Sequence, residues 1–326
     1  MKSPILSYCI LFFGVFALST SAIFVKLADA PATIIAFYRL FFAALILLPL
    51  LLFNRNNRNE LKTITRRQWG FGFISGLFLA AHYVLWFESL QYTSVASSTV
   101  IVTLQPLFSM IGGYFLFKER FTRGAIIGCL IAISGSIIIG WQDFQISGEA
   151  LYGDILAFIA AGIITAYFFI SQYVRKDLSL IPYSLISYGS SACFLGIFAY
   201  MKHESLIHYS TQTWLCFIGL AFIATILGQT IFNWLLKWMS ATVISMSILG
   251  ETIGTCILAY FILNETISLQ QGLGITVIFI GLALFLLQPN SNKKHDIILS
   301  CFHYPLCTIK PSGLKRLIII SLINFP

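Results

Sequence analysis

Ten long apolar runs constrain this chain more than any other feature of its sequence. They cover residues 4–27, 31–53, 68–90, 94–117, 123–140, 151–173, 181–201, 213–236, 241–263 and 270–287. A helix needs roughly 20 mostly apolar residues to cross about 30 Å of hydrocarbon. Lipid leaves no partner for free backbone groups, so runs of this length must be helical. The sequence predicts an all-α polytopic membrane protein with ten transmembrane helices. The first run could also be a signal peptide, although it is longer than a usual apolar signal region.

Composition agrees with this fold class. The chain is 58% hydrophobic and 10% charged, whereas a soluble domain has about 25% charged residues. Its net charge of +8 does not indicate a nucleic-acid partner, because the basic residues lie mostly in short loops between the runs. The seven cysteines form no CxxC pair and no zinc-like spacing with histidine. We therefore expect membrane lipids as partners and neither nucleic acid, metal nor cofactor.

The basic residues also predict the orientation. With both termini in the cytoplasm, seventeen Lys and Arg residues fall in inner segments and only two, Lys26 and Lys202, in outer ones. The loop 142–153 carries two acids and no base, so we expect it outside. The tail 291–326 has a short apolar patch among basic residues. It could lie on the membrane surface, but we expect a cytoplasmic, poorly ordered end.

The two halves of the chain repeat. A shift of 146 residues places 92–140 on 238–286 without a gap, with Ser94 on Ser240, Gly128 on Gly274 and Gly135 on Gly281. The halves 1–140 and 151–290 would then each hold five helices. Because five is odd, the second half must enter the membrane from the opposite side. Inverted repeats of this kind are typical of transporters, whose site lies between the halves at the midplane.

Two related polar residues mark that depth. Glu251 lies about ten residues into its run, and Gln105 falls on it under the same shift. A carboxylate at the bilayer centre costs roughly 2.5–3.5 kcal/mol and by default indicates a functional site. Pro106, beside Gln105, removes one backbone hydrogen bond and predicts a kink there.

Other polar residues lie inside the runs, and each has a structural alternative. Arg39 could bind a substrate carboxylate, or form a structural pair or snorkel. His82, with Tyr83 and Trp86, could form an aromatic pocket with one titratable group, or an ordinary hydrogen-bonded interior.

Gln229 and Asn233 share one face of their helix. They could line a cavity or bond between helices.

Several short sequences together resemble the EamA-type branch of the drug/metabolite transporter superfamily, over about residues 11–287. They are Phe37-Tyr38-Arg39, Phe117-Lys118-Glu119, Leu263-Asn264-Glu265, Gly153-Asp154-Ile155-Leu156-Ala157 and the glycine-spaced fifth and tenth runs. The resemblance implies two inverted five-helix repeats, a central cavity, and movement of small metabolites or amino acids across the inner membrane. Leu104-Gln105-Pro106 corresponds to Gly250-Glu251-Thr252, and the missing proline departs from the family pattern.

These observations predict a secondary transporter that works by alternating access, with a small polar or amino-acid-like solute as its partner. The eight residues expected at its binding site are Arg39, His82, Tyr83, Trp86, Gln105, Gln229, Asn233 and Glu251. A coupling proton is an open alternative, as are the direction of transport and the oligomeric state. A lipid-linked-sugar flippase and an intramembrane enzyme are the competing functions, but no catalytic motif supports the enzyme.

Overall fold

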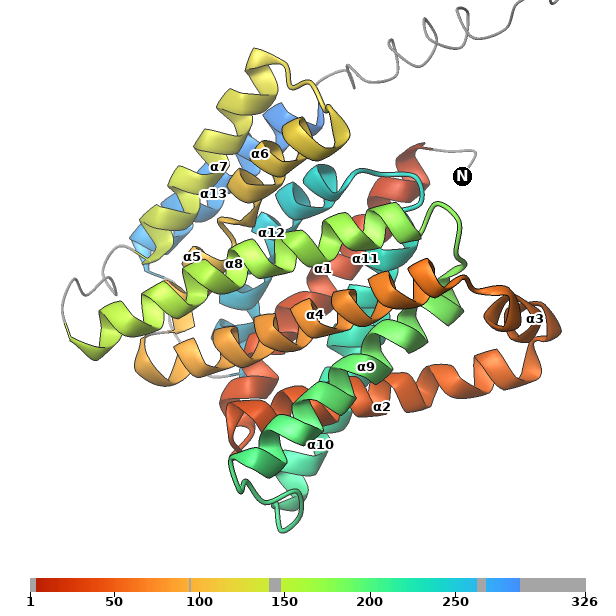
Figure 1. The fold of residues 1–326 in the computed structure, drawn as a ribbon. Coiled ribbons are helices and arrows are strands. Elements are labelled where there is room, and N and C mark those ends of the chain that lie inside the picture. The colour runs from red at the N-terminus through yellow and green to blue at the C-terminus, as the bar shows by residue number, and fades with distance from the viewer. Residues whose placement is uncertain (1–3, 94, 141–147, 263–267, 288–326) are drawn as a thin grey trace, which may run out of the picture. The chain divides into compact units, whose positions relative to one another are not determined.

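The computed structural model describes residues 4–93, 95–140, 148–262 and 268–287, and Figure 1 shows their arrangement. Every regular element in these ranges is helical. Nine helical segments there are long and apolar enough to span a membrane, and a tenth, Arg123–Ile139, is shorter but apolar. The tail 291–326, the loop residues 141–147, Ser94 and the sequence Leu263-Asn264-Glu265 lie outside the described residues.

The described part of the first half contains seven helices. They are α1 (Pro4–Leu27), α2 (Ala32–Phe53), α3 (Arg55–Thr63), α4 (Arg66–Tyr92), α5 (Val95–Val102), α6 (Gln105–Phe117) and α7 (Arg123–Gly140). The short helix α3 was not predicted, because its polar sequence has no apolar face. The Asn54 side chain starts it by accepting hydrogen bonds from the N–H groups of Asn56 and Asn57. A capping box of Thr65 and Gln68 then starts α4.

Seven elements are also found among the described residues of the second half. They are α8 (Glu149–Val174), α9 (Leu180–Met201), α10 (Thr211–Gly219), the π-helix η1 (Leu220–Gln229), α11 (Thr230–Leu235), α12 (Ala241–Ile262) and α13 (Leu269–Leu286). A capping box of Ser268 and Gln271 begins α13, as their spacing predicts. The elements α10, η1 and α11 follow one another without a break and together form one span.

The fourth apolar run is broken, rather than only kinked. Helix α5 ends at Val102 and α6 begins at Gln105, with a turn between them. Pro106 has no N–H group, so it cannot donate to the carbonyl of Val102 and the helix is interrupted. The corresponding helix α12 has Thr252 in place of proline and runs without a break. The two halves therefore differ at this depth.

The π-helix η1 is a second difference between the halves. The N-cap residues Thr65 and Ser210 are 145 residues apart, whereas Tyr83 and Gln229, farther along the same two helices, are 146 apart. The second half thus has one extra residue, and a π-helix accommodates it because each turn holds more residues than an α-turn. The hydroxyl of Thr230 donates to the Thr225 carbonyl, five residues back, at 2.9 Å.

Helices of one half pack mainly on helices of the other. Figure 1 shows α7 beside α13 and α2 beside α9, with α1, α4, α8 and α12 between these two pairs. Helix α4 packs on α8, as η1 and α10 pack on α1. Helix α1 packs on α12, as α8 packs on α5 and α6. Exchanging the two halves converts each of these helix pairs into itself or into another pair of the set, as a two-fold relation between repeats requires.

Individual atoms repeat the same relation. The hydroxyl of Ser19 donates to the carbonyl of Glu251 at 3.2 Å. The hydroxyl of Thr165 donates to the carbonyl of Gln105 at 3.3 Å. Both partners of the second bond are 146 residues from those of the first, in exchanged order. The shift found in the sequence thus relates equivalent contacts in the structure.

The crossing of α7 and α13 depends on glycines that obey this shift. A methyl group on Gly128 would lie 2.8 Å from the carbonyl oxygen of Gly281, and one on Gly135 would lie 2.8 Å from that of Gly274. These neighbours are backbone atoms, which cannot move aside as a flexible side chain can. Only glycine permits this close crossing.

Candidate functional site

A small cavity lies where the broken helix, the π-helix and α12 meet. Its volume is about 30 Å³, enough for about two water molecules at ~10–15 Å³ of such space each. It is lined by Leu18, His82, Tyr83, Trp86, Val102, Gln105, Ile164, Phe168, Gln229, Ile248 and Glu251. Both halves contribute, and six of the eight residues expected from the sequence are in this set.

The break before α6 and the π-helix η1 each place a polar side chain on the cavity wall. Gln105 is the first residue of α6, directly after the break, and Gln229 is the last residue of η1. Glu251 comes from the middle of α12. Gln105 and Glu251 are matching positions of the two repeats, and both line the same small space. The cavity therefore lies between the two halves, at positions that the repeat makes equivalent. Transporters built from inverted repeats hold their solute at such a place.

Several buried polar atoms of the cavity wall have no hydrogen-bond partner among the described residues. They are Tyr83 Oη, Trp86 Nε1, Gln105 Oε1 and Gln229 Nε2. A buried polar group left unpaired costs about 1–3 kcal/mol. Three of these groups can donate a hydrogen bond and Gln105 Oε1 accepts one. The Glu251 carboxylate is likewise without a hydrogen bond or ion pair in the described part of the chain, so the wall offers both donors and acceptors.

His82 and Trp86 form one aromatic side of the cavity. The His82 Nδ1–H donates to the carbonyl of Ala160 on α8 at 3.0 Å. The rings of His82 and Trp86 are stacked, with centroids 5.9 Å apart and planes 20° from parallel. The bond to α8 fixes the orientation of the imidazole and, through the stack, helps to place Trp86 over the cavity.

Arg39 lies behind Tyr83 rather than on the cavity. Its side chain is completely buried, and its guanidinium carbon is 4.2 Å from the centre of the Tyr83 ring. Its Nε donates to Thr225 Oγ1 at 2.9 Å, and its Nη1 donates to Ser21 Oγ at 2.6 Å. The observed contacts favour a positioning role, in which Arg39 holds Tyr83 by a cation–π contact.

Asn233 does not line the cavity either. It lies one turn beyond Gln229 and bonds to two buried tyrosines. Its Nδ2 donates to the hydroxyl of Tyr167 at 2.7 Å and to that of Tyr188 at 3.2 Å. The Tyr188 hydroxyl also shares a hydrogen bond of 2.9 Å with Thr230. Asn233 thus joins α8 and α9 to α11, which agrees with the interhelical alternative.

Sequence reasoning missed a buried cation at the end of α8 that is predicted to face the cytoplasm. Arg175 is 2% exposed. Its Nε donates to the carbonyl of Asn233 at 2.9 Å, and its Nη1 donates to that of Leu178. Burial lowers the pKa of Arg175 below its usual range, while Tyr183 and Glu60 act in the opposite direction. In the sequence Arg175 resembles any loop cation.

Comparisons with known proteins agree with this architecture. The profile of the EamA-like transporter family matches residues 5–141 and again 151–287. An S-adenosylmethionine uptake transporter of Rickettsia bellii is 28% identical over 80% of this chain and 84% of its own length. A probable amino-acid metabolite efflux pump of Escherichia coli is 28% identical over 57% of this chain and 65% of its own. An uncharacterized transporter of Haemophilus influenzae is 25% identical over 67% and 74%.

The fold also occurs among solved structures. One crystal structure matches with a TM-score of 0.74 over 87% of this chain and 98% of its own, at 17% sequence identity. This likeness confirms the predicted fold class, an all-α membrane protein of two inverted five-helix repeats. The family profile matches both halves and extends over most of the sequence. The chain therefore belongs to the EamA-like transporter family.

Proposed function

We propose that this protein is a secondary transporter of the inner membrane that moves a small polar, amino-acid-like solute by alternating access. The observation that carries the proposal is the central cavity, whose buried wall presents unpaired donors and acceptors beside the carboxylate of Glu251. Unpaired polar groups in a dry interior are costly unless a ligand satisfies them at some stage.

The chemistry of the wall favours a solute with an ammonium group. The Glu251 carboxylate and Gln105 Oε1 are acceptors for it, while Trp86 Nε1 and Gln229 Nε2 can donate to a carboxylate or carbonyl oxygen. The names of two relatives, an S-adenosylmethionine uptake transporter and an amino-acid metabolite efflux pump, support an amino-acid-like solute. If a proton is coupled to transport, Glu251 is the residue on the cavity that would carry it.

Transport requires the cavity to grow, because about 30 Å³ cannot hold such a solute. The interruption before α6 gives one wall a point at which it can move without breaking a complete helical ladder. In this proposal both termini are cytoplasmic, 1–140 and 151–290 are the two moving repeats, and 291–326 is a cytoplasmic tail. The distribution of Lys and Arg supports this orientation.

Uptake into proteoliposomes tests the proposal. Purified wild-type protein should accumulate or exchange at least one compound from a panel of labelled amino acids and related metabolites. With that compound, Glu251→Gln should lower uptake per folded molecule at least about thirtyfold, since truncating one partner of a buried charged contact costs about 2–5 kcal/mol. Glu88→Gln is the matched control, because Glu88 is on α4 but does not line the cavity. Near-normal uptake by Glu251→Gln would remove Glu251 from the mechanism.

A further inference from the structure

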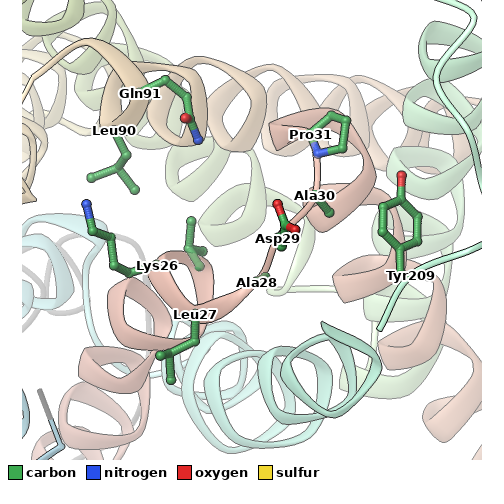
Figure 2. Close-up of a pocket in the computed structure, with 10 residues that line it drawn as sticks. Lys26, Leu27, Ala28, Asp29, Ala30, Pro31, Leu90, Gln91 and Tyr209 are labelled. Atoms are coloured by element: carbon green, nitrogen blue, oxygen red, sulfur yellow. The ribbon is translucent and has the colours of Figure 1, made fainter. Parts of the chain in front are cut away.

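A second, larger pocket lies at the end of the bundle that is predicted to face outward. Its volume is about 490 Å³, within the range of small-molecule sites. Its wall is formed by the end of α1, the turn before α2, the last part of α4 and the segment before α10. The lining residues are Val25, Lys26, Leu27, Ala28, Asp29, Ala30, Pro31, Leu90, Gln91 and Tyr209 (Figure 2). We call this space the outer pocket.

The outer pocket holds one positive and one negative side chain that are not paired. Lys26 is one of only two basic residues in predicted outer segments. The other, Lys202, lies 3.9 Å from a carboxylate oxygen of Glu204, the one ion pair found among the described residues. Lys26 therefore departs from the charge distribution of the chain without pairing to a protein carboxylate. Asp29 lies in the same pocket and likewise has no ion pair with another described residue.

The polar groups share one space. In Figure 2 the Lys26 side chain runs from α1 toward Leu90, and the Asp29 carboxylate lies on the turn after α1. The amide of Gln91 points from α4 into the space between them. The hydroxyl of Tyr209 donates to the carbonyl of Ser205 at 2.5 Å, which holds this ring at the far side of the pocket.

The same two helices connect the outer pocket to the central cavity. On α1, Leu18 lines the cavity and Val25 lines the outer pocket. The separation of seven residues between these positions corresponds to about 10 Å of helix. On α4, Trp86 lines the cavity and Leu90, one turn farther, lines the outer pocket. Trp86 thus lies at the boundary between the two spaces.

The positions of the second half that correspond to Lys26 and Asp29 are buried. Under the 146-residue shift, Lys26 corresponds to Gln172 and Asp29 to Arg175. Both of these counterparts are buried. Gln172 Oε1 accepts a hydrogen bond of 2.5 Å from the N–H of Ala241, and Arg175 donates to the carbonyls of Asn233 and Leu178. The two equivalent places therefore differ among the described residues: Lys26 and Asp29 line a pocket, whereas Gln172 and Arg175 are buried and hydrogen-bonded.

We propose that the outer pocket is a docking site for the zwitterionic head of the solute, with Lys26 taking its carboxylate and Asp29 its ammonium. This inference rests on the proposed transport function. A pocket with one free charge of each sign matches a zwitterion, whereas a simple anion or cation would leave one of the two charges facing a like charge. The solute then passes Trp86 to reach Glu251.

Thiol labelling in intact cells tests the site. The seven native cysteines are replaced and Gln91→Cys is added. The labelling rate is then compared for a cationic and an anionic membrane-impermeant methanethiosulfonate. Removing one charge at a separation on the order of 6 Å changes the rate ratio of the two reagents about three- to tenfold, allowing for salt. Lys26→Gln should disfavour the anionic reagent and Asp29→Asn the cationic one. Ile207→Cys, exposed in the same predicted outer region but not lining the pocket, serves as the labelling control, and Lys202→Gln as the charge control.

Protection from labelling identifies the ligand class. A mixture of the proteinogenic L-amino acids should slow labelling of Gln91→Cys. The matching decarboxylated amines and deaminated acids should not, and Lys26→Gln or Asp29→Asn should abolish the protection. Equal protection by amines or acids would overturn the zwitterion assignment. Absent protection, or labelling only from the cytoplasmic side, would overturn the docking site. Uptake that still depends on Glu251 in those cases would leave the transport function standing. If the cysteine-free protein does not fold, Gln91→Cys is measured in the native background against the parent rate.

Discussion

The crossing of α1 and α12 beside Glu251 allows a quantitative prediction. A methyl group on Gly254 would overlap Ser19 Oγ and lie 2.7 Å from Ser19 Cβ. The hydroxyl could rotate away, but Cβ moves only with the backbone of α1. Overpacking of this kind costs about 1–3 kcal/mol. Alanine favours a helix over glycine by about 1 kcal/mol, and losing the Ser19 bond to the Glu251 carbonyl costs about 0.6 kcal/mol.

The net destabilisation of Gly254→Ala is therefore about 1.6 kcal/mol at the middle of these ranges, and Tm should fall by about 3–6 °C. Gly189→Ala is the matched control, because a methyl group on Gly189, also inside a helix, meets nothing within 4 Å. That change should leave Tm unchanged or raise it slightly. Uptake should fall in Gly254→Ala as well, since α12 carries Glu251 one turn away and would move in the proposed transport cycle.

Tm is measured by heating the purified protein and using size-exclusion chromatography to determine the fraction that remains folded at each temperature. A Ser19→Gly background lacks both atoms that the methyl group meets. In that background Gly254→Ala should lower Tm little or raise it. The difference between backgrounds isolates the clash, as in a double-mutant cycle. If Gly254→Ala leaves Tm unchanged in both backgrounds, the close crossing of α1 and α12 is wrong.

Three further predictions concern charge and topology. Arg175→Met removes the hydrogen bonds to the carbonyls of Asn233 and Leu178, so a cysteine at Gln172 should label about tenfold faster in inverted vesicles; an unchanged rate would show that Arg175 does not keep this end closed. Arg39→Lys keeps the charge but loses the planar contact with Tyr83, so KM in the uptake assay should rise several-fold, whereas a change in abundance alone would indicate a structural role. An alkaline phosphatase fusion after residue 288 should be inactive and one in the loop 142–153 active, and the reverse pattern would invert the predicted orientation.

The fold was predictable because bilayer thickness fixes the length of a spanning helix. The apolar runs and the 146-residue shift required no side-chain contacts, and the bonds from Ser19 and Thr165 recur at the same shift. Sequence did not reveal where a helix changes type. Pro106 indicated a disturbance but not a complete break, and the extra residue in η1 becomes visible only when the N-caps Thr65 and Ser210 are known.

The sequence predicted the depth of the candidate site residues in the membrane, but not the direction in which each side chain points from its helix. Six of the expected residues line the cavity because polar side chains at the midplane turn inward. Arg39 and Asn233 have suitable depth, but packing turns Arg39 behind Tyr83 and Asn233 toward the tyrosines of α8 and α9. Tyr167 and Tyr188 were missed because, in an apolar run, a tyrosine resembles any packing aromatic. Their hydroxyls gain meaning only from the partners that the fold brings to them.

The extra residue of η1 has an energetic consequence for the transport cycle. In a perfectly duplicated chain, the outward-facing and inward-facing conformations would be the same structure turned over, and in symmetric surroundings each would be equally populated. One added residue makes the helical structure of the second half differ from that of the first. The two conformations are then no longer equivalent, so they would differ in free energy. A difference of only 1.4 kcal/mol would make one conformation about ten times more abundant than the other. In the alternating-access cycle proposed above, this insertion would give the empty protein a resting side without any ligand or ion to set it.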